Sequence, residues 1–126
     1  MNKKQMSEQD IRTKYITPAI LAAGWDRDLQ IREEGSFTKG KITVRRKIVK
    51  RGEQKRADYI LYWKPNIPLA IVEAKDNNHN IADGMEQALN YAEILDIPFV
   101  FTSNGDGFSF YDKTAEHNVQ IELALD

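Results

Sequence analysis

Two short apolar runs separated by a turn-forming segment constrain the fold of this chain more than any other feature. Residues 57–63 and 69–75 are rich in Ile, Val, Leu and aromatic side chains, and Lys64-Pro65-Asn66-Ile67-Pro68 between them is typical of a turn. The pattern predicts an antiparallel hairpin that passes through the core. We therefore expect an α/β fold with a mixed central sheet built around this hairpin.

The predicted hairpin brings two acidic side chains together. If Trp63 and Pro68 close the loop, Asp58 lies directly opposite Glu73, with Cβ atoms about 4.5 to 5.5 Å apart, where like charges are destabilising. Lys75 projects from the same face as Glu73, since side chains alternate along a strand. A register shifted by one residue would place Asp58 on the opposite face.

A divalent cation shared by the two carboxylates would explain their juxtaposition. The alternative is a structural salt-bridge cluster in which Lys75 offsets one acid and the other is solvated. The chain has no cysteine, and His79 and His117 are its two histidines, which excludes disulfides, thiolate zinc sites and a three-histidine site. Any metal must be held mainly by carboxylates, which favours Mg²⁺ or Mn²⁺.

The charge of the chain is unevenly distributed. Its 126 residues fit a single domain and carry a net charge of -1, yet residues 39–56 contain nine basic side chains and one acidic one, a local charge of +8. Such a segment favours a polyanion partner such as double-stranded DNA; the alternative is a solvated hairpin whose lysines protect a sheet edge. The candidate DNA-binding residues are Lys39, Lys41, Arg45, Arg46, Lys47, Lys50, Arg51, Lys55 and Arg56.

Helical segments are expected on both faces of the sheet. Ser7 and Asp10 fit a capping box that begins a first helix, Pro18 interrupts or restarts it, and Gly24 ends it. A second helix is predicted over 81–95, with Asn80 as N-cap and an apolar stripe along one side. The N-terminal helices are expected on one face of the sheet and the second helix on the other.

The remaining elements are expected to be strands. Residues 29–32, 42–49, 98–102 and 108–111 have strand-like patterns, and 119–125 fits either a strand or a helix. The apolar stretch 67–72 is far shorter than the ~20 residues of a membrane-spanning helix, and there is no apolar signal-peptide core, so a cytoplasmic protein with no membrane partner is expected.

The second helix carries two polar side chains one turn apart. Gln87 and Tyr91 are i, i+4 neighbours that flank the apolar stripe, so an amide and a phenol lie together beside the sheet. Both groups can hydrogen-bond a phosphate, a base or a catalytic side chain. The alternative is a glutamine at the helix margin beside a half-buried tyrosine.

Taken in order, these residues resemble a known nuclease pattern. Asp58, Glu73-Ala74-Lys75 and Gln87 with Tyr91 are similar to the PD-(D/E)XK motif with its trailing QxxxY motif. The most similar subtype is the N-terminal nuclease domain of the R (restriction) subunit of type I restriction enzymes. The resemblance extends over Ser7-Glu8-Gln9-Asp10-Ile11-Arg12, Pro18-Ala19, Ala23-Gly24-Trp25, Arg56-Ala57-Asp58-Tyr59, Val72-Glu73-Ala74-Lys75, Gln87-Ala88 with Tyr91-Ala92, and Thr102-Ser103-Asn104-Gly105.

The resemblance implies a restriction-endonuclease-like core and a Mg²⁺-dependent DNA endonuclease, with Mn²⁺ as a substitute metal. The implied metal ligands are Asp58, Glu73, the backbone carbonyl of Ala74 and, as the weakest transfer, Glu8. Lys75 would position or activate the attacking water, and Gln87 and Tyr91 would orient the DNA or the site. Glu33 and Glu34 compete with Glu8 for the role of third carboxylate, and His79 either assists the site or is a solvated loop residue.

Two departures from the family pattern affect these expectations. Ala57 stands where the name of the motif has Pro, and the chain has no G-x-x-x-x-G-K-S/T phosphate loop of a helicase motor. Residues 1–126 would then be a single nuclease-like domain, an N-terminal fragment of a larger restriction subunit, and this domain would be nearly inert when isolated. ATP would enter only through a helicase domain of the full-length chain, with modification and specificity subunits as further partners.

Three other functions stay open from the sequence. One is a non-catalytic DNA-binding module on the same fold, and another is a small stand-alone nuclease or resolvase. The third is a protein-docking module that uses aromatic residues around Trp25, Trp63 and Phe108 as a contact patch.

Overall fold

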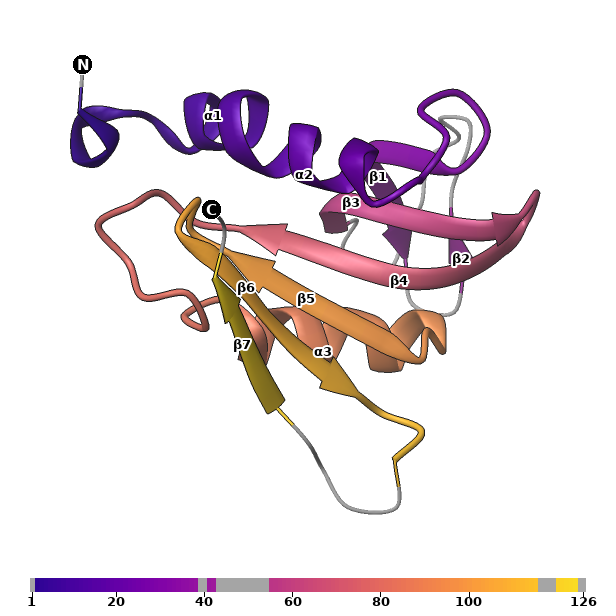
Figure 1. Cartoon of the computed structure of the whole chain (residues 1–126). Helices are drawn as coiled ribbons and strands as arrows, with labels where there is room; N and C mark the ends of the chain where they lie inside the picture. Colours follow the sequence, from indigo (N-terminus) through magenta and orange to yellow (C-terminus); the bar gives the residue numbers. More distant parts are fainter. Residues whose placement is uncertain (1, 39–40, 43–54, 116–119, 125–126) are drawn as a thin grey trace.

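A seven-stranded mixed sheet forms the centre of the computed structural model, which describes residues 2–38, 41–42, 55–115 and 120–124 (Figure 1). The strand order is β2-β1-β3-β4-β5-β6-β7, in which β4 and β5 are parallel and all other neighbours are antiparallel. The hairpin of β3 and β4 lies in the middle of the sheet, so the predicted α/β architecture is confirmed.

The helices and strands have the following bounds. The helical segments are a 3₁₀ turn Lys3–Gln5, α1 Glu8–Ile11, a π turn Arg12–Ile16, α2 Thr17–Ala22 and α3 Met85–Leu95. The strands are β1 Ile31–Thr38, β2 Lys41–Ile42, β3 Lys55–Lys64, β4 Ile67–Ala74, β5 Phe99–Ser103, β6 Gly107–Asp112 and β7 Gln120–Ala124. No helix among the described residues is long and apolar enough to cross a membrane.

The N-terminal helical segment begins where the sequence predicts. Ser7 Oγ accepts a hydrogen bond from the Asp10 N–H at 3.0 Å, and the Ser7 N–H donates to Asp10 Oδ2 at 3.2 Å, which completes the capping box. Pro18 lies in the first turn of α2, so a regular α-helix restarts there after the π turn, which is one of the two predicted alternatives. Its ring would clash with the carbonyl of Lys14 in a regular α-helix, and the wider π turn before it relieves that conflict, so that the helical path continues into α2.

The register of the central hairpin is as predicted, although its turn is different. Tyr59 lies opposite Val72, so Asp58 and Glu73 are the next residues along the two strands. The loop is shorter than expected, because Lys64 pairs with Ile67 across a two-residue turn in which Asn66 has a φ of 66°. Irregular pairing near Tyr62 absorbs the difference, so the shorter turn leaves the register unchanged.

The predicted start of the second helix is wrong by four residues. Helix α3 begins at Met85 after Gly84, and residues 81–84 form turns in which the Asn80 N–H donates to Asp83 Oδ2 at 3.0 Å. The carbonyl of Ile81 accepts a hydrogen bond from Thr102 Oγ1 at 2.9 Å. This tertiary contact holds residues 81–84 against β5 in a non-helical conformation.

The other expected strands agree with the structure in part. The strand predicted over 29–32 begins at Ile31, the pair over 98–102 and 108–111 corresponds to β5 and β6, and the last segment is the strand β7. Most of the strand predicted over 42–49 lies outside the described residues, with Ile42 in β2.

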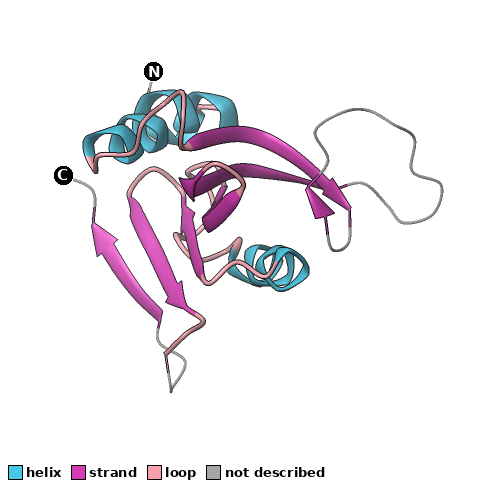
Figure 2. Cartoon of the chain, turned by 90° about the vertical axis from the view of Figure 1, so that its right-hand side faces the viewer, coloured by secondary structure: helices cyan, strands magenta, loops and turns pink. Residues whose placement is uncertain are grey.

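The N-terminal helical segment and α3 lie on opposite faces of the sheet (Figure 2). A hydrophobic core lies under each of these two helical layers. Met85, Ala88 and Ala92 of α3 pack on the face that includes Ile60 and Ile71. On the other face, side chains of the N-terminal helical segment pack against the next residues along β3 and β4: the cluster contains Ile11, Ile16, Ile20, Tyr59, Leu61 and Val72. The two helical layers are therefore on opposite faces, as predicted.

Two glycines with positive φ allow a matched test of this packing. Gly105 has a φ of 92° and a Cβ added there would lie 3.0 Å from Ile11 Cγ2, whereas Gly24 has a φ of 107° and open space around it. Gly24→Ala should cost about 1 kcal/mol of unfolding free energy through backbone strain alone. Gly105→Ala should cost roughly 2 to 4 kcal/mol, because the new methyl also presses on the buried Ile11. Urea unfolding of both variants measures the difference, and equal losses would refute the contact.

Candidate metal and nuclease site

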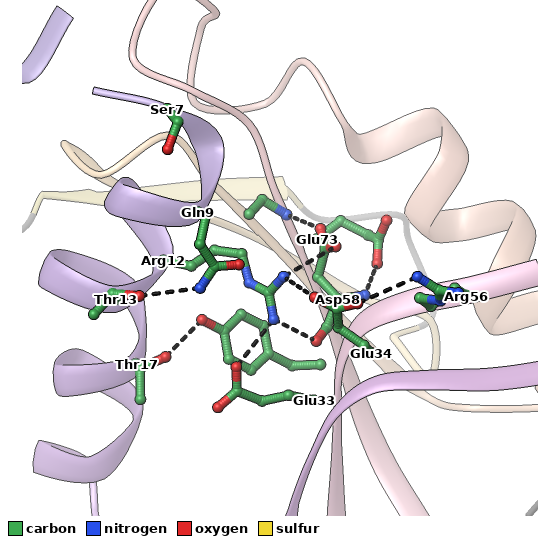
Figure 3. Close-up of polar contacts among 12 residues, drawn as sticks. Ser7, Gln9, Arg12, Thr13, Thr17, Glu33, Glu34, Arg56, Asp58 and Glu73 are labelled. Atoms are coloured by element: carbon green, nitrogen blue, oxygen red, sulfur yellow. Dashed lines mark hydrogen bonds and ion pairs between the residues drawn. The ribbon is translucent and has the colours of Figure 1, made fainter. Parts of the chain in front are cut away.

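Asp58 and Glu73 face each other at the end of the regular part of the central hairpin (Figure 3). The backbone N–H of Asp58 donates to Glu73 Oε2 at 2.7 Å, and the backbone N–H of Ala74 donates to Asp58 Oδ2 at 2.7 Å. Each acid therefore accepts a hydrogen bond from the opposite strand. The predicted juxtaposition of the two carboxylates is confirmed.

A pocket of about 120 Å³ opens beside these two acids. Three structural parts supply its walls: the N-terminal helical segment, the β3–β4 hairpin, and the loop and helix that follow it. The lining residues are Glu8, Arg56, Asp58, Glu73, Ala74, Lys75, Gly84 and Gln87. Seven of the eight are residues to which the sequence assigns a role, and Gly84 is the addition.

Lys75 and Gly84 form one side of the pocket. The backbone N–H of Lys75 donates to the Ser103 carbonyl at 2.9 Å, which fixes the chain immediately after β4. A Cβ on Gly84 would lie 3.5 Å from Lys75 Cε, so the lysine side chain passes close over this glycine.

Gln87 connects helix α3 to the acidic pair. Its Nε2 donates to Tyr91 Oη at 2.9 Å and lies 3.4 Å from Glu73 Oε1. Tyr91 packs edge-on against Phe37, with 5.0 Å between ring centroids. Packing of Tyr91 and the hydrogen bonds of Gln87 therefore connect the core under α3 with the carboxylate of Glu73.

Burial shifts the protonation of the acids in this pocket. Glu73 is 5% exposed, and burial together with the charge of Asp58 raises its pKa to about 8. Burial also raises the pKa of Asp58, against the lowering effect of the Ala74 N–H. The pKa of Glu8 is raised by burial and by the charge of Asp58. All three carboxylates are thus held where their negative charge is unfavourable without a cation.

The donor atoms of the pocket suit a hard, partly hydrated cation. Asp58 and Glu73 supply two facing carboxylates, and Ala74, whose backbone carbonyl the family resemblance assigns to the metal, also lines the pocket. Within the part of the chain that the structure describes, no group of three or more carboxylate or histidine side chains is arranged to hold a metal ion. Mg²⁺ commonly binds through one or two carboxylates and keeps several waters, so the residues present fit this ion.

Glu33 and Glu34 have a different partner from the one that the sequence leaves open. Arg12 Nη2 donates to Glu33 Oε1 and Arg12 Nη1 to Glu34 Oε2, both at 3.0 Å, while Glu8 lines the pocket. Arg12 is thus a residue of this region for which the sequence predicts no role. Its position one turn after Glu8, between the core residues Ile11 and Ile16, is the signal that it faces the sheet.

Most of the predicted DNA-binding segment falls outside the described residues. Arg56 lies at the pocket, its side chain is 64% exposed, and its Nη1 donates to Glu34 Oε1 at 3.3 Å. Lys55 precedes it in β3, and Lys41 belongs to β2. The predicted residues outside the described part are Lys39, Arg45, Arg46, Lys47, Lys50 and Arg51.

Two further candidates do not join the site. His79 is exposed in the loop after β4, where its Nδ1 lies 3.2 Å from Asp76 Oδ1, as expected for a solvated loop histidine. The aromatic contact patch does not form either. Trp25 and Phe108 pack against the core under the N-terminal helices, whereas Trp63 is 57% exposed.

The raised pKa of Glu73 predicts how stability depends on pH without metal. The folded chain keeps a proton on Glu73 between pH 4.5 and about 8, where the unfolded chain has released it. Unfolding free energy should therefore fall with rising pH across this window, by on the order of a few kcal/mol. Glu73→Gln keeps the acceptor for the Asp58 N–H and should flatten the slope.

Urea unfolding at several pH values in the presence of a chelator measures the effect. Glu93→Gln is the control, because Glu93 is an exposed acid on α3 paired with Lys113. An unchanged slope in Glu73→Gln would show that Glu73 titrates in the folded chain as it does in the unfolded one.

Comparisons with known proteins identify the family of this chain. A family model described as the N terminus of the type I restriction enzyme R protein matches residues 29–124. The endonuclease subunit of the type I restriction enzyme EcoAI from Escherichia coli is 51% identical over 125 residues. That match covers 99% of this chain and 15% of the relative.

A solved structure shares the fold. It is a fragment from Vibrio vulnificus assigned to an HsdR subunit of a type I restriction enzyme, with a TM-score of 0.75 and 38% sequence identity. The likeness covers 92% of this chain and 23% of that one, so the chain corresponds to a small part of each relative. The chain belongs to the family of N-terminal regions of type I restriction enzyme R subunits.

Proposed function

We propose that this chain is the Mg²⁺-dependent endonuclease region of a type I restriction enzyme R subunit and hydrolyses phosphodiester bonds of DNA. The observation that carries the proposal is the buried, facing pair of Asp58 and Glu73 beside Lys75. A like-charged buried pair is unfavourable by itself, and a bound cation turns the repulsion into shared coordination.

Asp58, Glu73 and the Ala74 carbonyl would hold the Mg²⁺ or a substituting Mn²⁺, with Glu8 closing the pocket from the helical side. When bound, the ion supplies a water of lowered pKa and stabilises the charge that develops on the phosphate. Gln87 and Tyr91 orient the carboxylate of Glu73 through their hydrogen bonds. Lys75, at the pocket wall, positions the attacking water and stabilises its negative charge.

Contacts to the DNA backbone would come from basic residues next to the pocket. Arg56 lines the pocket and is exposed, so it can reach a phosphate while the acidic pair binds the ion. Lysine and arginine contacts to phosphates place DNA without reading its sequence. We therefore assign no sequence preference to this region.

The relatives are named as subunits of larger enzymes. We propose that this chain likewise works within a full-length R subunit, together with a helicase motor that uses ATP and with modification and specificity subunits. Those parts would find the target and bring the DNA to the pocket, so the region alone would cut poorly.

A non-catalytic DNA-binding module is the second candidate, favoured by the basic residues Lys55 and Arg56 in β3. A module that only binds DNA does not account for the buried acids. Neutral residues in place of Asp58 and Glu73 would remove the repulsion between the two carboxylates and would make the surface more attractive to phosphates.

Titration with Mn²⁺ separates the two candidates. The chain should bind Mn²⁺ at millimolar or lower concentration, Asp58→Ala should lose this binding because one of two carboxylate ligands is gone, and Glu93→Gln should bind like the wild type. Isothermal calorimetry at pH 8 measures the affinities. A wild-type chain that does not bind the ion supports the non-catalytic module.

Cleavage by the assembled restriction enzyme tests the reaction itself. Asp58→Ala and Lys75→Ala in the full-length subunit should each slow DNA cleavage by about 100-fold or more, through loss of a metal ligand or of the group that positions the water. DNA affinity, measured by fluorescence anisotropy, should change little, and Glu93→Gln should cut normally. Wild-type cleavage by both alanine variants would end the proposal.

A further inference from the structure

A buried arginine from the N-terminal helical segment contacts two strands beside the proposed site (Figure 3). Arg12 is 4% exposed, and its guanidinium carbon lies 4.9 Å from the centroid of the Tyr59 ring. It donates to the carboxylates of Glu33 and Glu34 on β1 and, through Nη2 at 3.3 Å, to the backbone carbonyl of Asp58 on β3. The guanidinium of Arg12 thus joins β1 to β3, the strand that carries the candidate metal ligand Asp58.

The regular strand pairing is interrupted at the residue that Arg12 contacts. Between β1 and β3, the paired residues pass from Glu33 with Tyr59 to Gly35 with Ala57, so Glu34 and Asp58 are skipped. Pairing between β3 and β4 also begins only at Tyr59. At Asp58, side chains serve as partners of the peptide groups: the N–H donates to Glu73, and the carbonyl accepts from Arg12.

The backbone of Glu34 is bent in a way that serves the same arginine. Consecutive residues of a regular strand point to opposite faces, yet Glu33 and Glu34 both bind Arg12. Glu34 has a φ of 54°, a left-handed conformation that is unfavourable for a residue with a side chain and that breaks the alternation. Strand β1 is therefore irregular at Glu34, and this irregularity lets the carboxylates of both Glu33 and Glu34 bind the guanidinium of Arg12.

The contacts of Arg12 are concentrated at the end that faces Asp58. Nη1 and Nη2 make all the hydrogen bonds described above, whereas the Nε–H is buried without a partner among the described residues. Nη1 also lies 3.9 Å from Asp58 Oδ1, while Oδ2 accepts from the Ala74 N–H. The carboxylate of Asp58 is therefore confined between Arg12 and the end of β4.

We propose that Arg12 is a positioning residue of the nuclease site, which holds Asp58 in its metal-binding orientation and keeps Glu33 and Glu34 out of the pocket. The inference rests on the proposed function. It explains why Glu8, Asp58 and Glu73 line the pocket while the two glutamates of β1 do not.

The sign of the effect on metal affinity tests this role. Arg12→Met removes a positive charge beside the site, and by charge alone the chain should then bind a cation more tightly. Loss of positioning acts in the opposite direction, and changes in groups that orient metal ligands commonly weaken binding about 10- to 100-fold. We expect Arg12→Met to bind Mn²⁺ at least about tenfold more weakly than wild type in isothermal calorimetry.

Arg12→Lys is the second variant, because it keeps the charge and the aliphatic stem but cannot reach three acceptors at once. It should weaken Mn²⁺ binding as well. Arg32→Met is the matched control: Arg32 lies on β1 next to Glu33, but its side chain lines a different hollow, together with Tyr62, and its loss should leave Mn²⁺ affinity unchanged. Thermal melts first establish the temperature at which each variant is folded, and the titrations are made below it.

Single-turnover cleavage by the assembled enzyme completes the test. Both Arg12 variants should slow cleavage about 10- to 100-fold at saturating DNA, with unchanged DNA affinity. Tighter or equal Mn²⁺ binding by Arg12→Met, or wild-type cleavage by Arg12→Lys, would overturn the role of Arg12 even if Asp58→Ala is inactive. Wild-type cleavage by both Asp58→Ala and Lys75→Ala would instead overturn the proposed function, and this inference with it.

Discussion

The backbone hydrogen bonds that the carboxylates of Asp58 and Glu73 accept across the central hairpin are the constraint on which the rest of the structure depends. Each carboxylate accepts a backbone N–H from the opposite strand, so the acids cannot separate without opening the end of the hairpin. Their facing position in turn requires the register of β3 and β4, because a shift of one residue would move Asp58 to the other face. The apolar residues that pack under the two helical layers hold that register.

Burying like charges in this way has a cost that neighbouring groups reduce only in part. The Ala74 N–H and Arg12 favour the ionised form of Asp58, whereas burial outweighs them and raises its pKa. Glu73 is more strongly affected, because it is more deeply buried and faces the charge of Asp58. The polar groups of the chain therefore stabilise the geometry of the pair but leave its charge incompletely balanced, and strongly perturbed carboxylates of this kind are common at functional sites.

The sequence predicts the parts of this arrangement that depend on local patterns. Two apolar runs and a turn are enough to place Asp58 opposite Glu73, and the register tolerates the shorter turn because irregular pairing near Tyr62 compensates for it. The start of α3 was missed because Asn80 and Asp83 form a turn that imitates a capping box, and Thr102 on another strand decides against the helix. The role of Arg12 is not predictable from the sequence for a related reason. Its hydrogen-bond partners come from β1 and β3, which approach the helical segment only in the folded chain. No local sequence pattern indicates the positive φ of Glu34.

The near-neutral net charge of the chain is a sum over acidic and basic side chains that occupy different places around the candidate site. In the proposed function, the acidic pocket would repel the phosphates of DNA, and positive charge on both sides of the carboxylates would offset that repulsion. Arg12 lies on the buried side, and Arg56 lies on the exposed side, at the mouth of the pocket. Glu34 accepts hydrogen bonds from both arginines and so links the two. In the proposed function, a phosphate that approached Arg56 would compete with Glu34 for the same guanidinium, so DNA binding and the arrangement of charges behind Asp58 would be connected through the side chain of Glu34.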